Sequence, residues 1–303
     1  MMSSPVQILA RNLQAIATGP SGDGANVFLL EEAEGNLLQE LWVDNQPVIK
    51  TFVTSGAKEN TPAVYLTNEA ERYIFFLDNT NQLRCVTYDE NDEEWDDAPF
   101  NDVFGGIEVY ENTRLSGFSN PSGMMIVFET QPGQLATLVG RDGQWKVTGA
   151  VPAKVEPGAA HTTVDGPNKL DIFCFGHDSQ ILHLVQDHNS GSWDASVVEN
   201  SRLEAPLARI AAFPKEDALT FDLVILLSNS QMIWIEAGGA KTDLGVVDGT
   251  KLIPPTAAEC SLFLPPRYIS QFANSGFVNT GYITYNNYYM GQPSQGIPAW
   301  GRF

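Results

Sequence analysis

The stretch 223–236, LVILLSNSQMIWIE, is the clearest indication of the fold, because the chain repeats its pattern. It reads as an apolar run, a short turn, and then Gln231 followed by a second apolar run. The same pattern recurs in 29–41 (LLEEAEGNLLQEL), 74–86 (IFFLDNTNQLRCV), 126–138 (IVFETQPGQLATL) and 172–184 (IFCFGHDSQILHL). Each copy predicts a β-hairpin made of two buried strands.

Two turn signals accompany the hairpins with a period of about 50 residues. The first is a tight turn rich in Gly, Pro and Asn, at 20–22, 68–69, 120–123, 166–168, 214–215 and 274–276. The second is the residue that opens the later strand of each hairpin: Asn36, Gln82, Gln134, Gln180, Gln231 and, less clearly, Asn287. Short strands with this period are typical of propeller blades. The sequence therefore predicts an all-β fold, a six-bladed β-propeller of four-stranded antiparallel blades, forming a single domain over 1–303.

Three of the repeats carry a tryptophan shortly after the second signal, namely Trp95, Trp145 and Trp193. We expect these side chains to pack between neighbouring blades, because one blade cannot bury both faces of its sheet. The proline-rich connection 243–267 interrupts the repeat before its last unit. It is interpreted either as a lid over one face or as a plain surface loop.

Composition excludes several classes of protein. The net charge of −20 argues against nucleic acid and anionic membranes, which both require clustered Lys and Arg. No apolar run approaches the roughly 20 residues that cross a bilayer. Three cysteines give no disulfide framework, and no secretory leader is visible, so we expect a cytoplasmic protein. A leader removed earlier would instead make it secreted or vacuolar. The sequence does not decide between a monomer and a homodimer.

The repeat length and hairpin pattern resemble the fungal fucose-specific lectins over nearly the whole chain. That resemblance implies a six-bladed propeller in which an Arg on strand 2, a Glu on strand 3 and a nearby aromatic ring bind the sugar. Here strand 2 has no Arg at the expected place. The corresponding strand-3 positions hold Gln39 or Glu40, Cys85, Thr137, His183 and Trp234. The repeated fucose sites are therefore predicted to be lost.

A second group with this lectin-like fold is the fungal hetero-Diels–Alderases of tropolonic sesquiterpenoid biosynthesis, which the sequence is similar to in having lectin-like blades without the lectin residues. That resemblance implies a cofactor-free cycloaddition between a tropolone-derived quinone methide and a macrocyclic, humulene-type terpene. The alternatives are a carbohydrate-binding lectin with divergent sites and an interaction propeller with no small ligand. A lectin needs similar repeated sites for avidity, whereas a catalyst needs one asymmetric pocket.

The candidate site residues lie mainly on the inner strands, which line the central channel of a propeller. Cationic groups there suit an acidic, oxygen-rich ligand and would stabilise negative charge that grows on the heterodiene. The predicted catalytic residues are Arg114, His161, Arg209 and Arg267. The predicted substrate-binding residues are Tyr65, Trp234, Tyr268 and His183. For each residue a purely structural role is the alternative. No spacing typical of zinc, calcium or phosphate sites occurs, so neither a metal nor a cofactor is predicted.

Overall fold

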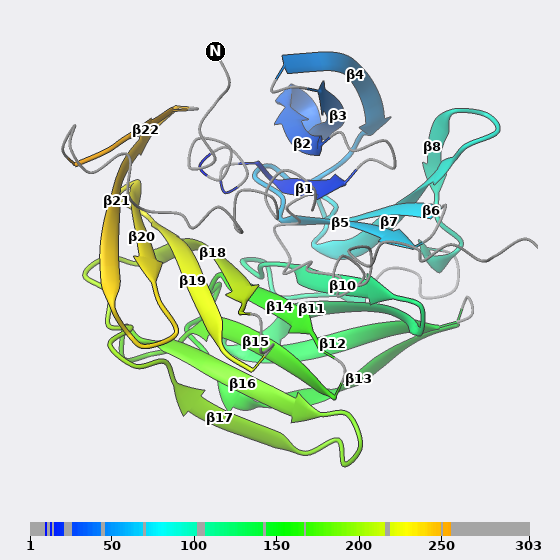
Figure 1. Ribbon diagram of the computed structural model, residues 1–303. Helices are drawn as coiled ribbons and strands as arrows, with labels where there is room; N and C mark the ends of the chain where they lie inside the picture. Colours follow the sequence, from blue (N-terminus) through cyan, green and yellow to red (C-terminus); the bar gives the residue numbers. More distant parts are fainter. Residues whose placement is uncertain are drawn as a thin grey trace, which may run out of the picture.

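The computed structural model describes residues 15–255, apart from 21–25, 44–45, 69–70, 102–106, 142–143, 167, 216–218 and 250, together with Ala10 and Leu13. Within these residues the chain forms five antiparallel sheets that follow one another in sequence, which we call blades 1 to 5. Figure 1 shows the five sheets arranged around a centre, as the hairpin repeat predicted. The sixth predicted blade and Asn287 lie outside the described residues.

Each blade begins with an inner strand and proceeds outward through consecutive hairpins. Blade 1 contains β1 (Ala17–Pro20), β2 (Asn26–Glu32), β3 (Asn36–Val43) and β4 (Gln46–Thr54), with the 3-10 turn η1 (Ala33–Gly35) before β3. Blade 2 contains β5 (Ala63–Asn68), β6 (Glu71–Leu77), β7 (Gln82–Asp89) and β8 (Glu94–Asp97), and β9 (Ile107–Glu108) pairs with β7. Blade 3 contains β10 (Ser116–Asn120), β11 (Gly123–Gln131), β12 (Gln134–Arg141) and β13 (Gln144–Lys154).

Blades 4 and 5 repeat the arrangement. Blade 4 contains β14 (His161–Asp165), β15 (Lys169–Phe175), β16 (Ile181–Asp187) and β17 (Trp193–Val197). Blade 5 contains β18 (Leu207–Pro214), β19 (Phe221–Leu227), β20 (Gln231–Ile235), β21 (Lys241–Asp248) and β22 (Lys251–Ile253). The described blades thus have four or five strands, and the third strand starts at or beside the predicted Asn or Gln in all five.

The inner strands contact one another in order around the centre: β1 with β5, β5 with β10, β10 with β14, and β14 with β18. Between the sheets lie clusters of buried apolar side chains, each shared by adjacent blades. The predicted packing role of Trp145 is confirmed, because its ring lies edge-on to Phe75 and Phe100 of blade 2, with centroids 5.4 Å away in both cases. Burial between sheets therefore holds neighbouring blades together.

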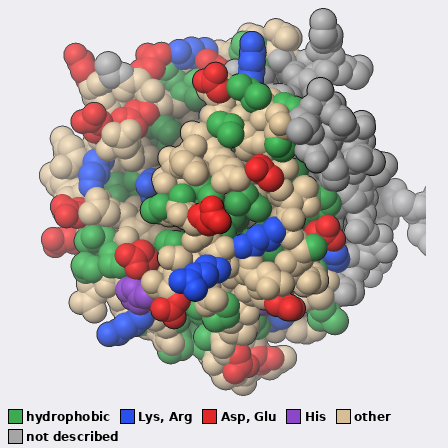
Figure 2. Space-filling view, turned by 90° about the vertical axis from the view of Figure 1, so that its left-hand side faces the viewer, with side chains coloured by type: hydrophobic (Ala, Val, Ile, Leu, Met, Phe, Trp, Pro, Cys, Tyr) green, Lys and Arg blue, Asp and Glu red, His purple; other side chains and the backbone are tan. Residues whose placement is uncertain are grey.

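The described part of the chain has no helix long and apolar enough to cross a bilayer. On the face drawn in Figure 2, acidic side chains are interspersed with Lys and Arg and are not gathered into one patch. The excess of negative charge is therefore spread over that face.

Candidate functional site

Three of the four predicted catalytic residues come together at the propeller centre. Arg114 precedes β10, His161 begins β14 and Arg209 lies in β18, and all three line one cavity of about 20 Å³. Such a space holds roughly one water-sized group. The described part of this axial cavity is therefore too small for a substrate with several rings. Arg267, the fourth residue, and Tyr268 lie outside the described residues.

His161 is fully engaged in hydrogen bonds within the fold. Its Nε2 lies 3.1 Å from the carbonyl oxygen of Arg114, which can only accept, so Nε2–H donates. Nδ1 then accepts from the Ser116 hydroxyl at 2.6 Å, and Ser116 in turn lies 2.6 Å from Thr163 Oγ1. Burial lowers the pKa of His161 to about 4, so its ring is neutral at pH 7. This geometry favours a structural role for His161 over proton transfer.

Tyr65 and Trp234 are packed into the core. Tyr65 is fully buried, and its ring lies so close to Gly19 that a Cβ there would approach Tyr65 Cδ1 to 2.0 Å. Burial raises the pKa of Tyr65 to about 12. Trp234 is buried in the apolar cluster of blade 5. Both positions suit the packing alternative that the sequence left open.

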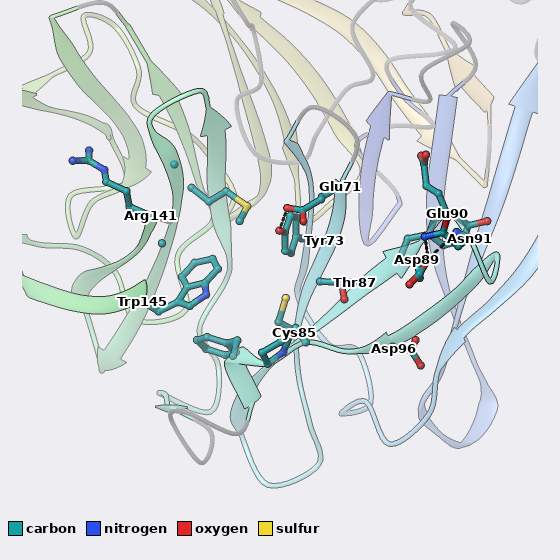
Figure 3. Close-up of a pocket in the computed structure, with 17 residues that line it drawn as sticks. Glu71, Tyr73, Cys85, Thr87, Asp89, Glu90, Asn91, Asp96, Arg141 and Trp145 are labelled. Carbon is teal, nitrogen blue, oxygen red and sulfur yellow. Dashed lines mark hydrogen bonds between the residues drawn. The ribbon is translucent and has the colours of Figure 1, made fainter. Parts of the chain in front are cut away.

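A larger pocket lies between blades 2 and 3, with a volume of about 750 Å³ (Figure 3). Its apolar wall combines Tyr73 and Phe100 of blade 2 with Met124 and Trp145 of blade 3, above the buried thiol of Cys85. This inter-blade pocket is wide enough for a ligand of drug size.

Polar groups surround the aromatic wall of the inter-blade pocket. The Tyr73 hydroxyl donates to the Glu71 carboxylate, and burial together with that bond raises the pKa of Tyr73. Arg141 donates through Nε to the Ser122 carbonyl at 2.9 Å, and its other N–H groups make no hydrogen bond within the described chain. Asp89, Glu90 and Asp96 line the opposite side. The pocket thus offers a ring-stacking surface, one cationic donor and several carboxylates.

The five third-strand positions singled out in the sequence differ from blade to blade. On the third strand, Gln39 faces Leu29, Cys85 faces Phe75, Thr137 faces Val127, His183 faces Phe173 and Trp234 faces Val224. All but His183 are buried, and none of the five carries a carboxylate. Glu40, the other candidate in blade 1, accepts a hydrogen bond from Trp42 at 3.0 Å. At this position, therefore, no residue type is repeated among the described blades.

His183 packs at the junction between blades 4 and 5. Its ring stacks on Phe173 with centroids 4.3 Å apart and meets Phe221 of blade 5 edge-on at 5.9 Å. Its Nε2 lies 2.7 Å from the buried carboxylate of Asp171, which also pairs with Lys169 at 3.0 Å. The predicted substrate-binding residue is thus a member of a packed polar cluster. Across the described residues, no group of His, Cys, Asp and Glu is positioned to hold a metal ion.

Comparison with known proteins identifies the fold. No protein-family model and no curated protein sequence matches the chain. Among solved structures, AofleA from Arthrobotrys oligospora has a TM-score of 0.62 at 17% identity, covering 79% of this chain and 74% of that one. The six-bladed propeller of Aleuria aurantia lectin, described as recognising fucose, has a TM-score of 0.61 at 17% identity over 79% and 80%. The BP39L lectin from Burkholderia pseudomallei has 0.57 at 12% over 80% and 71%. The predicted lectin-like propeller fold is confirmed.

Sequence reasoning missed the residues that shape the inter-blade pocket. It assigned Trp145 only a packing role and gave no role to Tyr73, Met124 and Arg141. One feature that could have pointed to the pocket is Gly140, which pairs with Trp145 across β12 and β13. Because glycine has no side chain, it leaves room for the indole ring. The closeness of blades 2 and 3 at this point depends on tertiary packing.

Proposed function

We propose that this chain is a cofactor-free pericyclase, a hetero-Diels–Alder catalyst that joins a tropolone-derived quinone methide to a humulene-type terpene. The observation that carries the proposal is the large aromatic pocket between blades 2 and 3, beside five blade positions that do not repeat. A volume of about 750 Å³ accommodates two organic reactants together. The resemblance of the sequence to lectin-like hetero-Diels–Alderases supplies the reaction class.

In this cycloaddition a C–C and a C–O bond form together, and no group leaves. The protein must therefore hold the two reactants side by side, which contributes most of the rate when the geometry is near attack. The rings of Trp145, Tyr73 and Phe100 provide the apolar surface for that alignment. The guanidinium of Arg141 is the donor suited to the quinone-methide oxygen, where negative charge grows.

The test is incubation of the purified protein with a tropolone quinone-methide precursor and a humulene-type alkene, followed by chiral chromatography. We expect one dominant stereoisomer formed above the background rate. Trp145→Ala and Arg141→Met should each lower the rate by roughly tenfold to a hundredfold. Trp193→Phe, on blade 4, is the matched control. Product identical in rate and stereochemistry to the reaction without protein would contradict the proposal.

The sequence analysis placed the catalytic residues at the propeller centre, and this location predicts different effects of the variants on the rate. If Arg114 and Arg209 hold the substrate, Arg114→Met and Arg209→Met should lower the rate while Trp145→Ala leaves it unchanged. Measuring all four variants under one set of conditions therefore distinguishes the two locations.

A carbohydrate-binding lectin with divergent sites is the second candidate. The observation that favours it is the combination of the Trp145 ring with the carboxylates Glu71, Asp89 and Asp96 in one pocket, since sugars offer both hydroxyl groups and an apolar ring face. Aleuria aurantia lectin, named above as recognising fucose, supports the same reading. A glycan array tests it: saturable binding that is lost in Trp145→Ala, without any cycloaddition, would favour the lectin.

A further inference from the structure

The two arginines of the axial cavity have no charge partner among the described residues. Neither the Arg114 nor the Arg209 side chain makes a hydrogen bond or an ion pair there. By contrast, Arg72 pairs with Glu90 at 3.2 Å and Arg84 with Asp97 at 3.4 Å. In a chain with a net charge of −20, two such cations in one cavity are unexpected.

The cavity itself makes both cations less favourable. Burial lowers the pKa of Arg114, and burial together with the positive charge of Arg114 lowers the pKa of Arg209 to about 10. The remaining wall is apolar and includes Leu115 and Ile210. His161, which is neutral at pH 7, adds no charge, and no carboxylate of the described chain lines the space. Like charges in a partly desolvated site call for a counter-charge.

The size of the axial cavity selects the kind of anion. About 20 Å³ is close to the space that one water molecule requires, so it favours a monatomic anion over a tetrahedral oxyanion or an organic acid. We propose that the axial cavity binds one monatomic anion of chloride size between Arg114 and Arg209, and that this anion stabilises the ring of inner strands. The site joins β14 and β18 to the segment before β10, so its occupation links blades 3, 4 and 5.

The experiment compares melting temperatures of the dialysed full chain in sodium chloride, sodium bromide, sodium sulfate and sodium gluconate at equal ionic strength. We expect chloride and bromide to raise Tm saturably by roughly 2–4 °C over gluconate, because an anion that binds only the folded state stabilises it. Sulfate should give the same Tm as gluconate apart from its general salting effect. That effect is measured on Arg209→Met, which lacks the proposed site. Crystals grown with bromide should give an anomalous peak between the two guanidinium groups.

Arg209→Met is the decisive variant, since it keeps a long side chain and removes one charge. It should lose the halide response, whereas the exposed Arg202→Met should keep it. Melting temperatures that are equal in chloride and gluconate would overturn the proposal, as would a sulfate response in the wild type that equals the chloride response and disappears in Arg209→Met. This inference is independent of the proposed cycloaddition, which is measured in the pocket between blades 2 and 3.

Discussion

Around Cys85 the junction between blades 2 and 3 is open, whereas the equivalent part of the junction between blades 4 and 5, around His183, is closed. Both are built from the same strand positions, with Cys85 facing Phe75 in the first and His183 facing Phe173 in the second. Cys85 is small, and the rings of Tyr73, Phe100 and Trp145 line a pocket of about 750 Å³. His183 fills its junction by stacking on Phe173.

This comparison teaches that one backbone plan can either expose or bury the surface between two blades, depending on side-chain volume and polar partners. At the closed junction Asp171 and Lys169 supply an ion pair that fixes the imidazole. At the open junction the Glu71 carboxylate binds only the Tyr73 hydroxyl among the described residues. A fold with repeated geometry thereby acquires one distinctive site.

The largest effect should come from acid acting on His161, which ties blade 4 to blade 3 at the propeller centre and belongs to neither junction. The unfolded chain takes up a proton near pH 6.5, but folded His161 stays neutral down to about pH 4. The unfolded state therefore binds more protons in this window, and stability is lost as the pH falls from about 6.5 towards 4. The loss attributable to His161 should reach up to about 3 kcal/mol. Urea unfolding at pH 7 and pH 4.5 should show a smaller loss in His161→Gln than in the wild type, and equal losses would contradict this assignment.

Removing the buried carboxylate of the closed junction should have the next largest effect. Asp171→Ala leaves His183 and Lys169 without their partner, and hydrogen bonds to charged groups contribute about 1.5–3 kcal/mol. We expect the free energy of unfolding to fall by about 2 kcal/mol. Asp96→Ala is the matched change at the open junction, where the carboxylate is exposed, and should cost less than about 0.5 kcal/mol. Similar losses in the two variants would erase the energetic contrast between the junctions.

Much of the fold could be predicted from the sequence, because turn residues and the hairpin pattern act locally. Gln82, Gln134 and Gln231 each begin a third strand as expected. The candidate site could be predicted only in part. The expectation that inner strands line the channel placed Arg114, His161 and Arg209 together, although Arg114 lies just before β10. Whether a cavity remains there depends on volumes contributed by several blades. The inter-blade pocket required the distance between Trp145 and Phe75, which no local pattern encodes.

A bulky residue at position 140 should disturb the open junction alone. A Cβ on Gly140 would lie 2.4 Å from Cζ3 of Trp145, so Gly140→Val must displace the indole. We expect a loss of about 1–2 kcal/mol of stability and about a tenfold weaker binding of any ligand held by that ring. Gly149→Val on β13 is the control, since a Cβ added there would meet no described atom within 4 Å. Unchanged chemical shifts of the Trp145 indole N–H in Gly140→Val would show that the packing is looser than described.

The smallest effect concerns the two described cysteines, tested in a Cys260→Ser background. Burial raises the pKa of both thiols, with that of Cys174 raised to about 12, so both should react with iodoacetamide far more slowly than an unfolded thiol. Cys85 borders the open pocket, whereas Cys174 belongs to the cluster shared by blades 3, 4 and 5. A small local opening is enough to expose Cys85, while Cys174 requires blades to separate. Mass spectrometry should therefore find Cys85 labelled about tenfold faster than Cys174, and a ligand in the inter-blade pocket should slow only Cys85. Faster labelling of Cys174 would mean that the closed side of the ring opens more readily than the pocket.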